Sequence, residues 1–166
     1  MNKYIELRNK FIPEDIKIIF VFESPPENKG YFYDSNAKTG ELLFRSLMEV
    51  LFNEKPKTKI EGLKKFQNSG YLLVNPIYEP VNKLSDKIAD ELILKNYPEF
   101  LKDLKNLTKN KDVGIILVKS NICRLLENRL IGDKFNVLNN AKIIPFPIHY
   151  HFQQFKKLVS DLCNLT

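Results

Sequence analysis

Side chains able to do chemistry follow each of four apolar segments in this 166-residue chain. The segments are short and rich in β-branched and aromatic residues, which is typical of strands buried on both faces. The side chains are an acid, an amide, a cation with a hydroxyl, and two histidines: Glu23, Asn75, Lys119, Ser120, His149 and His151. Parallel strands present their carboxyl ends at one edge of a sheet, where α/β proteins bind ligands. We therefore expect these six side chains to converge at that edge.

The residue types suggest chemistry on a nucleobase. An amide has both a donor and an acceptor, so Asn75 can pair with the edge of a base. Phe32, in the middle of an aromatic triplet, can stack on its face. Glu23 can orient a water and stabilise a cationic sugar as the base departs, and His149 or His151 can donate to the oxygen of the departing base. These are the roles needed to excise a base turned out of the stack.

Each of these residues also has a purely structural interpretation. Glu23 can be an exposed loop carboxylate or a capping partner, and Asn75, which precedes a proline, can bond its own backbone in an Asx turn. Phe32 can be a packed lid residue, and the histidines can be surface or packing residues. Two interpretations therefore remain: a catalytic site, and a pocket that binds a nucleobase without turnover. A nucleotide-phosphate enzyme is disfavoured, because no Gly-rich phosphate loop follows the first apolar segment.

Four strands alternating with helices must position these side chains. The expected strands are Ile18–Phe22, Tyr71–Val74, Val113–Val118 and Lys142–Ile144. The expected helices begin at a cap at Thr39, cover Ile60–Asn68, run from Ser85 to about Asn110 with a break near Pro98, follow Lys119–Asn121, and form the tail. Residues 1–15 look like a short lead-in. Right-handed crossovers then predict an α/β fold, a three-layer α/β/α sandwich with a central four-stranded parallel sheet, as a single domain over residues 1–166.

Composition limits the class of protein. The hydrophobic share is 43%, the charged share 28% and the net charge +6, which is ordinary for a globular chain. The positive charge permits nucleic-acid binding, but a solvated lysine-rich surface has the same charge. No apolar run approaches the roughly 18 residues of a membrane span, and the N-terminus lacks the apolar centre of a signal peptide. We therefore expect no membrane association and a cytoplasmic location.

The two cysteines, Cys123 and Cys163, stand far apart in the sequence. Two unclustered thiols cannot hold an iron–sulfur cluster or a tetrahedral zinc ion, and small buried hydrophobes are the simpler interpretation. We expect no metal and no cofactor. No self-complementary apolar stripe remains after the core is assigned, so we expect a monomer.

Two longer segments carry a family resemblance. The segment Phe20–Leu51 reads FVFESPPENKGYFYDSNAKTGELLFRSLMEVL, and Tyr71–Asn82 reads YLLVNPIYEPVN. The first resembles the opening motif of the uracil-DNA glycosylase superfamily, a Gly-Glu-x-Pro-Gly loop followed by Gly-x-Pro-Phe and a Ser/Thr-Gly-x-Leu-Leu helix start. Glu23 and Pro25 match the loop, and Phe32 matches the stacking Phe. The second segment resembles the family's next motif, a strand that ends in the base-reading Asn.

The chain also departs from the family pattern. Phe22 and Pro26 replace the two loop glycines, and the four cysteines of the iron–sulfur branch are absent. The segment 146–148, Phe-Pro-Ile, stands where the family has His-Pro-Ser. The family's leaving-group donor is therefore missing unless His149 or His151 replaces it.

The resemblance implies a DNA base-excision glycosylase. Such an enzyme hydrolyses the N-glycosidic bond of a flipped deaminated or damaged base of the uracil type, and its partner is single- or double-stranded DNA. In this chain Glu23 would activate water, Phe32 would stack and Asn75 would read the base. Three further residues are expected against the substrate: Pro25, Lys119 and Ser120. The alternative is a catalytically inactive or divergent member of the same fold that binds a nucleobase or nucleic acid.

Overall fold

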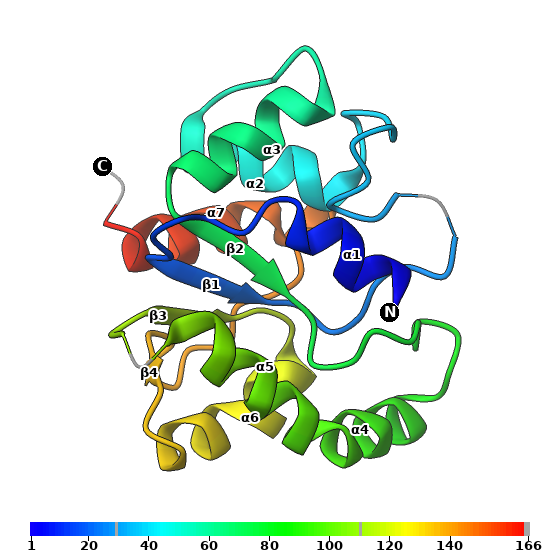
Figure 1. Cartoon of the computed structure of the whole chain (residues 1–166), viewed down its shortest axis with the longest axis vertical. Coiled ribbons are helices and arrows are strands. Elements are labelled where there is room, and N and C mark those ends of the chain that lie inside the picture. The colour runs from blue at the N-terminus through cyan, green and yellow to red at the C-terminus, as the bar shows by residue number, and fades with distance from the viewer. Residues whose placement is uncertain (29, 110, 165–166) are drawn as a thin grey trace.

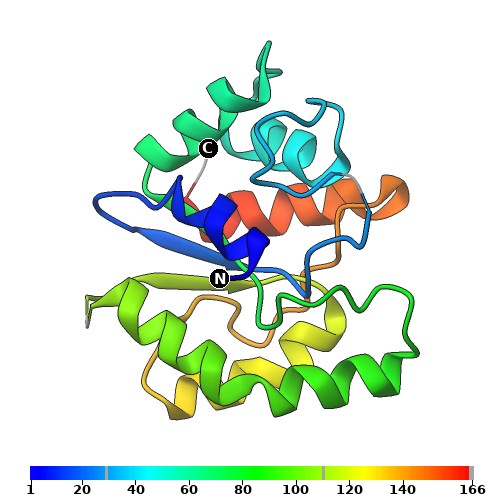
Figure 2. The same ribbon diagram turned by 45° about the vertical axis from the view of Figure 1, so that its right-hand side comes forward.

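A four-stranded parallel sheet forms the middle layer of the structure, a computed structural model that describes residues 1–28, 30–109 and 111–164. The strands lie in the order β2 (Tyr71–Val74), β1 (Ile18–Val21), β3 (Gly114–Leu117) and β4 (Asn136–Val137). One face is covered by α2 (Leu42–Phe52), α3 (Lys59–Asn68) and α7 (Phe152–Leu162), and the other by α4 (Asp86–Lys95), α5 (Tyr97–Thr108) and α6 (Ser120–Gly132) (Figure 1, Figure 2). The predicted α/β/α sandwich is confirmed. Within the described ranges, no helix is long and apolar enough to cross a bilayer.

The register of the sheet brings three strand ends to one level. Val21 of β1 pairs with Val74 of β2 on one side and with Leu117 of β3 on the other. All three side chains are fully buried, because helices cover both faces of the sheet. Three predicted site residues follow these ends within two positions: Glu23, Asn75 and Lys119. The apolar pattern of the strands therefore places three polar side chains at one edge.

From α2 onward the helices follow the predicted pattern, including the break near Pro98, with one difference at the start of α2. Helix α2 begins after the predicted cap at Thr39, because the carboxylate of Glu41 caps it and accepts from the backbone N–H groups of Leu43 and Phe44, both at 2.9 Å. The long helical region from Ser85 is two helices, with Ser85 capping α4 and Pro98 in the first turn of α5. Proline fits there because N–H groups in the first turn of a helix have no intrahelical acceptor, so its missing N–H costs no hydrogen bond. The predicted end of this region, Asn110, lies outside the described residues.

The predicted fourth strand at Lys142–Ile144 is wrong. The fourth strand is β4. Beyond it, the side-chain amide of Asn139 bonds to the backbone of β3 where a longer strand would pair. Its Oδ1 accepts from Leu117 N at 2.8 Å, and its Nδ2 donates to Leu117 O at 2.9 Å. Only the carbonyl of Ile144 then bonds to the end of β3, accepting from Lys119 N at 2.8 Å. Lys142–Ile144 is therefore not a strand, because the side chain of Asn139 already bonds to the backbone of Leu117.

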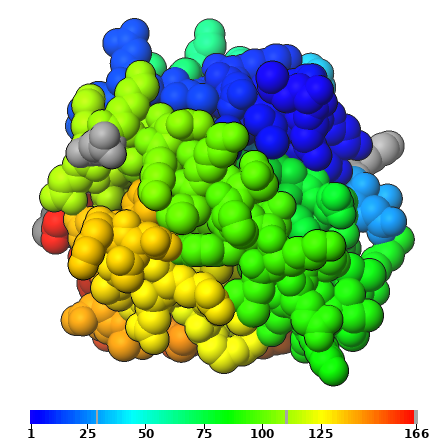
Figure 3. Space-filling model, turned by 60° about the horizontal axis from the view of Figure 1, so that its bottom comes forward, coloured from blue at the N-terminus to red at the C-terminus, as the bar shows by residue number. Residues whose placement is uncertain are grey.

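Residues 1–15 are more than a lead-in, because they contain helix α1 (Lys3–Asn9). Arg8 is buried and ties α1 to α5, donating to Asp103 at 3.1 Å and to the hydroxyl of Tyr78 at 2.9 Å. Figure 3 shows α1, in dark blue, lying against the yellow-green surface of α5. A helix of seven residues is too short to show a helical period in the sequence.

The two cysteines lead to a testable pH effect. Cys123 is buried and Cys163 is half-buried, and burial raises the pKa of both thiols, that of Cys163 to about 12. A raised pKa means that the stabilisation linked to the Cys163 proton is present below pH 9 and is lost as the pH rises toward 12. We expect the free energy of unfolding to fall less steeply above pH 9 in Cys163→Ala than in the wild type, measured by urea unfolding. Parallel pH profiles would contradict this expectation.

Candidate functional site

A cavity of about 520 Å³, here named the strand-end pocket, lies at the carboxyl ends of β1, β2 and β3. Its walls are mainly apolar and include Phe22, Phe32, Leu73 and Phe146. A few polar side chains interrupt this wall: Glu23, Ser24, Glu41, Asn75, Asn82 and Lys119. Apolar walls with a small number of polar groups are typical of small-molecule pockets, which measure about 300–1,000 Å³.

The strand-end pocket brings together five of the eight predicted site residues: Glu23, Pro25, Phe32, Asn75 and Lys119. Ser120 is not among them, because it begins α6 and is exposed. These five come from three separate segments of the chain, so the convergence expected at the sheet edge is present for them.

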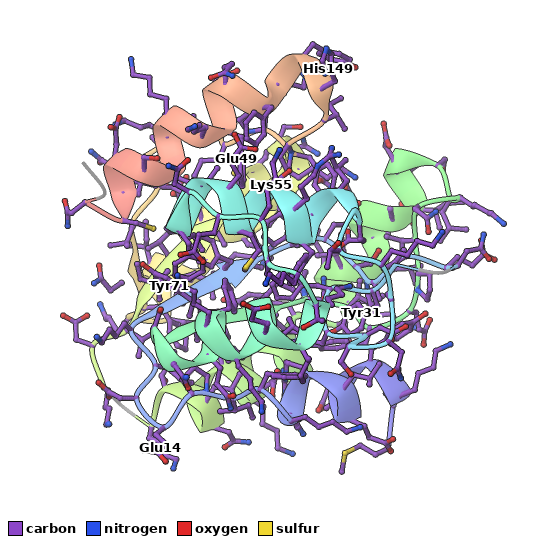
Figure 4. All side chains as sticks on the ribbon, turned by 90° about the horizontal axis from the view of Figure 1, so that it is seen from above. Glu14, Tyr31, Glu49, Lys55, Tyr71 and His149 are labelled. Carbon is purple, nitrogen blue, oxygen red and sulfur yellow. The ribbon has the colours of Figure 1, made fainter. Side chains whose placement is uncertain are left out.

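The two histidines do not line the strand-end pocket. His149 is exposed and lines a separate cavity of about 380 Å³ with Arg45 and Glu49. Figure 4 shows His149 and Tyr31 on opposite sides of α2. The ring of His151 packs 4.6 Å from that of Tyr150, which is 77% exposed. The expectation that a histidine faces the pocket is not met.

Phe146 and Ile148 explain why the histidines turn away. Both line the strand-end pocket, and the 3₁₀ turn η1 (His149–His151) follows them directly and leads into α7. The backbone therefore leaves the pocket wall after Ile148, and the two histidines lie outside it. Phe146 is only half-buried and meets Phe22 edge-on at 6.1 Å, so it is an aromatic wall residue that the sequence analysis missed.

Asn75 has an unpartnered acceptor in the pocket wall. Its side chain is almost fully buried, and its Nδ2 donates to the carbonyl of Phe22 at 3.0 Å. Its own backbone N–H donates to the hydroxyl of Tyr78 at 3.4 Å. The side chain does not form the Asx turn considered above, because that turn needs a hydrogen bond to Oδ1. Its Oδ1 is buried and has no hydrogen-bond partner. Leaving such an acceptor unpaired costs about 1–3 kcal/mol.

The unpartnered buried oxygens gather around the strand-end pocket. In the part of the chain that the structure describes, they are Tyr31 Oη, Asn75 Oδ1 and Asn121 Oδ1. Tyr31 and Asn75 line the pocket, and Asn121 donates to Glu23. Folded proteins satisfy nearly all buried polar groups, so the unpartnered oxygen of Asn75 indicates a place that a ligand or ordered water completes.

Glu23 is held at the pocket by two neighbours from the β3–α6 turn. Its carboxylate accepts from the ammonium of Lys119 and, at 2.8 Å, from Nδ2 of Asn121. The same Nδ2 also donates to Asp90 at 3.1 Å, which links Glu23 to α4. A carboxylate has about four acceptor positions, so Glu23 keeps capacity for a water or ligand. Asn121 was not predicted as a site residue, although it follows Lys119 by two positions.

The backbone of Lys119 is strained. Its φ of 86° and ψ of 137° lie where L-residues are rare, and the conformation is held by the bond from its N–H to Ile144 O and by that from Cys123 N to its own carbonyl at 3.0 Å. Strain of this kind costs of order 1–3 kcal/mol and tends to occur at functional sites. In this chain it places a cation in the pocket wall.

The strain at Lys119 predicts an unusual order of stabilities. Lys119→Gly and Lys119→Ala both remove the contact with Glu23, but only glycine adopts a positive φ freely. We expect the glycine variant to be the more stable of the two by about 1 kcal/mol, measured by urea unfolding. An alanine variant of equal or higher stability would contradict the strain.

Phe32 is both a core residue and a pocket residue. Its ring meets Tyr33 edge-on at 4.9 Å and Phe66 at 5.1 Å, and it is only 2% exposed. The packed interpretation of Phe32 is therefore correct, and the ring offers the pocket only a small part of its surface. The half-buried ring of Phe146 offers more.

A neighbouring cavity of about 420 Å³ is a weaker candidate site. It shares Asn75 with the strand-end pocket and is also lined by Asn2, Asn96, Glu99 and Asp103, among others. Three of its polar side chains are already engaged: Asn2 and Asn96 donate to backbone carbonyls, and Asp103 pairs with Arg8. The walls of the strand-end pocket are more apolar, as in typical small-molecule sites, which favours that pocket as the ligand site.

Comparison with known proteins adds no relative, because the chain matches no family model, no curated protein and no solved structure. The resemblance to uracil-DNA glycosylases therefore depends on the motifs described above. Among the described residues, no group of three or more His, Cys, Asp or Glu side chains is arranged to hold a metal ion.

Proposed function

We propose that the strand-end pocket binds a nucleobase turned out of a DNA strand, and that the protein hydrolyses the bond between this base and its sugar. One observation carries the proposal: Glu23, Lys119 and Asn75, whose buried side-chain oxygen has no partner, line one largely apolar cavity. A nucleobase has apolar faces and an edge of N–H and C=O groups, which match the apolar walls and the amide.

Asn75 is assigned to reading the base edge. Its Oδ1 accepts from an N–H of the base, while Nδ2 stays on the carbonyl of Phe22 and keeps the amide in place. The second hydrogen of Nδ2 is available to a carbonyl of the base. Bases with an N–H at this position are preferred, because they remove the cost of the unpaired oxygen.

Glu23 and Lys119 are assigned to the bond cleavage. Glu23 orients a water whose oxygen bonds to C1′ of the sugar, and it accepts the proton that this water loses. The bond from C1′ to the base nitrogen breaks, and its electron pair leaves with the base. Lys119 has further N–H donors beyond the one on Glu23, and these stabilise the negative charge on the departing base. Lys119 thus takes the role first expected of a histidine.

A base-release assay tests the proposal. The purified protein is incubated with single- and double-stranded oligonucleotides that contain uracil, hypoxanthine or other damaged bases, and free base is measured. We expect release with turnover from at least one of these bases. No release across the panel by folded protein would contradict the proposed hydrolysis.

A second candidate function is base binding without turnover. The observation that favours it is that Lys119 is paired with Glu23 and both histidines lie outside the pocket, so neither histidine serves as a proton donor to the base. This candidate predicts that the same oligonucleotides bind, measured by fluorescence anisotropy, and that no base is released.

A further inference from the structure

A buried lysine lies behind the wall of the strand-end pocket. Lys59 begins α3, and its side chain has no exposed surface. Its ammonium donates to the backbone carbonyl of Tyr31 at 2.7 Å, and it lies 3.8 Å from a carboxylate oxygen of Glu41 and 5.4 Å from the centre of the Phe44 ring. Lysine is almost never fully buried unless it is paired, so this position requires an explanation.

Burial disfavours the charges of both Lys59 and Glu41. Burial lowers the pKa of Lys59 and raises the pKa of Glu41, although each charge partly offsets the shift of the other. Desolvation is the largest cause of both shifts. Buried ion pairs with this balance can often be replaced by apolar groups without loss of stability.

The two residues hold the middle of the loop that joins β1 to α2. Tyr31, whose carbonyl receives the Lys59 hydrogen bond, lies in the pocket wall beside Phe32 and Gly30. Gly30 has a φ of 108°, and a Cβ there would lie 3.2 Å from Cγ of Glu41, so the loop passes closely over this carboxylate. Both oxygens of Glu41 also cap α2. The pair therefore connects the loop to the starts of α2 and α3.

We propose that Lys59 and Glu41 are positioning residues, whose pairing holds the Tyr31–Phe32 wall in its ligand-ready form and adds no net stability to the fold. The effect on the loop follows from the geometry alone. The effect on ligand binding rests on the proposed function of the strand-end pocket. Preorganisation of this kind raises affinity, because the loop is already ordered before the ligand binds and no ordering cost is added on binding.

The test uses a neutral double variant, Lys59→Met/Glu41→Gln, and the single variant Lys59→Met. Methionine fills a similar volume without charge, and glutamine can still accept one of the capping bonds. The control is Lys65→Met on the same helix, because Lys65 pairs with Glu54 in an exposed ion pair. Three quantities are measured: the melting temperature, backbone hydrogen exchange, and the affinity for free uracil at a temperature where all variants are folded.

We expect the double variant to melt at the same temperature as the wild type or higher. Amide exchange between residues 24 and 40 should rise at least about tenfold in both Lys59 variants, with no change in β3 or α5. Affinity for uracil should fall about tenfold. Lys65→Met should change none of these, because its ion pair is exposed.

Three results would overturn the inference. Unchanged exchange in the loop would show that Lys59 does not hold it, whatever the function of the pocket. A lower melting temperature of the double variant would show that the pair stabilises the fold. Faster loop exchange with unchanged uracil affinity would show that the wall does not need to be held for binding. If the wild type binds no base while the loop exchange still rises, the proposed function fails and the role of Lys59 in the loop stands.

Discussion

Glu23→Gln is expected to lower the rate of base release by about 10²- to 10⁴-fold, because glutamine cannot accept a proton from the attacking water. Glutamine has the shape of glutamate and can still accept the hydrogen bond from Asn121, so the pocket keeps its form. The measurement is single-turnover release from the best oligonucleotide substrate, with a thermal melt of each protein to show that it is folded.

A matched control for Glu23 lies in the same loop. Glu27 pairs with Lys83 at 2.5 Å, in an exposed ion pair outside the strand-end pocket. Glu27→Gln should release base at the wild-type rate. Equal rates in Glu23→Gln and the wild type would rule out Glu23 as the base that activates water, even if the protein proves to be a glycosylase.

Asn75→Ala is expected to weaken base binding by about tenfold to a hundredfold, because it removes the amide that reads the base edge. This range corresponds to the 1–3 kcal/mol that one or two hydrogen bonds contribute, at about 1.4 kcal/mol per factor of ten. The protein should also lose about 1–3 kcal/mol of stability, since the carbonyl of Phe22 loses its donor. Isothermal titration with the released base and urea unfolding measure the two effects.

Asn96→Ala separates the two effects of the Asn75 substitution. Asn96 also donates its side-chain amide to a backbone carbonyl, that of Pro76 at 2.6 Å, but it lines the neighbouring cavity and not the strand-end pocket. It should therefore lose stability and keep its base affinity. If both variants lose the same affinity, the loss comes from the loop between β2 and α4, and Asn75 does not read the base.

The strands and their common edge could be predicted from the sequence because burial on both faces leaves a plain apolar signature. Ile18–Val21 and Tyr71–Val74 are short runs of this kind, and each is followed within two residues by a polar side chain and within four by a proline. Parallel pairing then brings Glu23 and Asn75 to one edge without any knowledge of the loops. This part of the site follows from strand register.

The direction of side chains in loops could not be predicted. His149 and His151 follow an apolar segment as Glu23 and Asn75 do, but that segment is not a strand, because Asn139 takes its hydrogen bonds with β3. The histidines therefore leave the sheet edge in a 3₁₀ turn. A pattern of residue types does not show that a side chain will make the hydrogen bonds that a neighbouring strand would otherwise make.

The burial of Lys59 could not be predicted from the sequence for a different reason. It stands at the start of a helix between other lysines, where a solvated side chain is the normal expectation. Only the fold shows that its ammonium points inward to the carbonyl of Tyr31. Burial of a charged residue depends on contacts between distant segments, so it leaves no local mark on the sequence.

The most direct test of the central claim is a titration of the ¹⁵N-labelled protein with free uracil, followed by NMR. If the strand-end pocket takes the base at Asn75, the side-chain NH₂ signal of Asn75 and the backbone signals of Phe22 and Glu23 shift with one saturation curve, while the side-chain signal of Asn96 stays in place. Shifts confined to Asn96 and its cavity, or no shift up to the solubility limit of uracil, would contradict the base pocket.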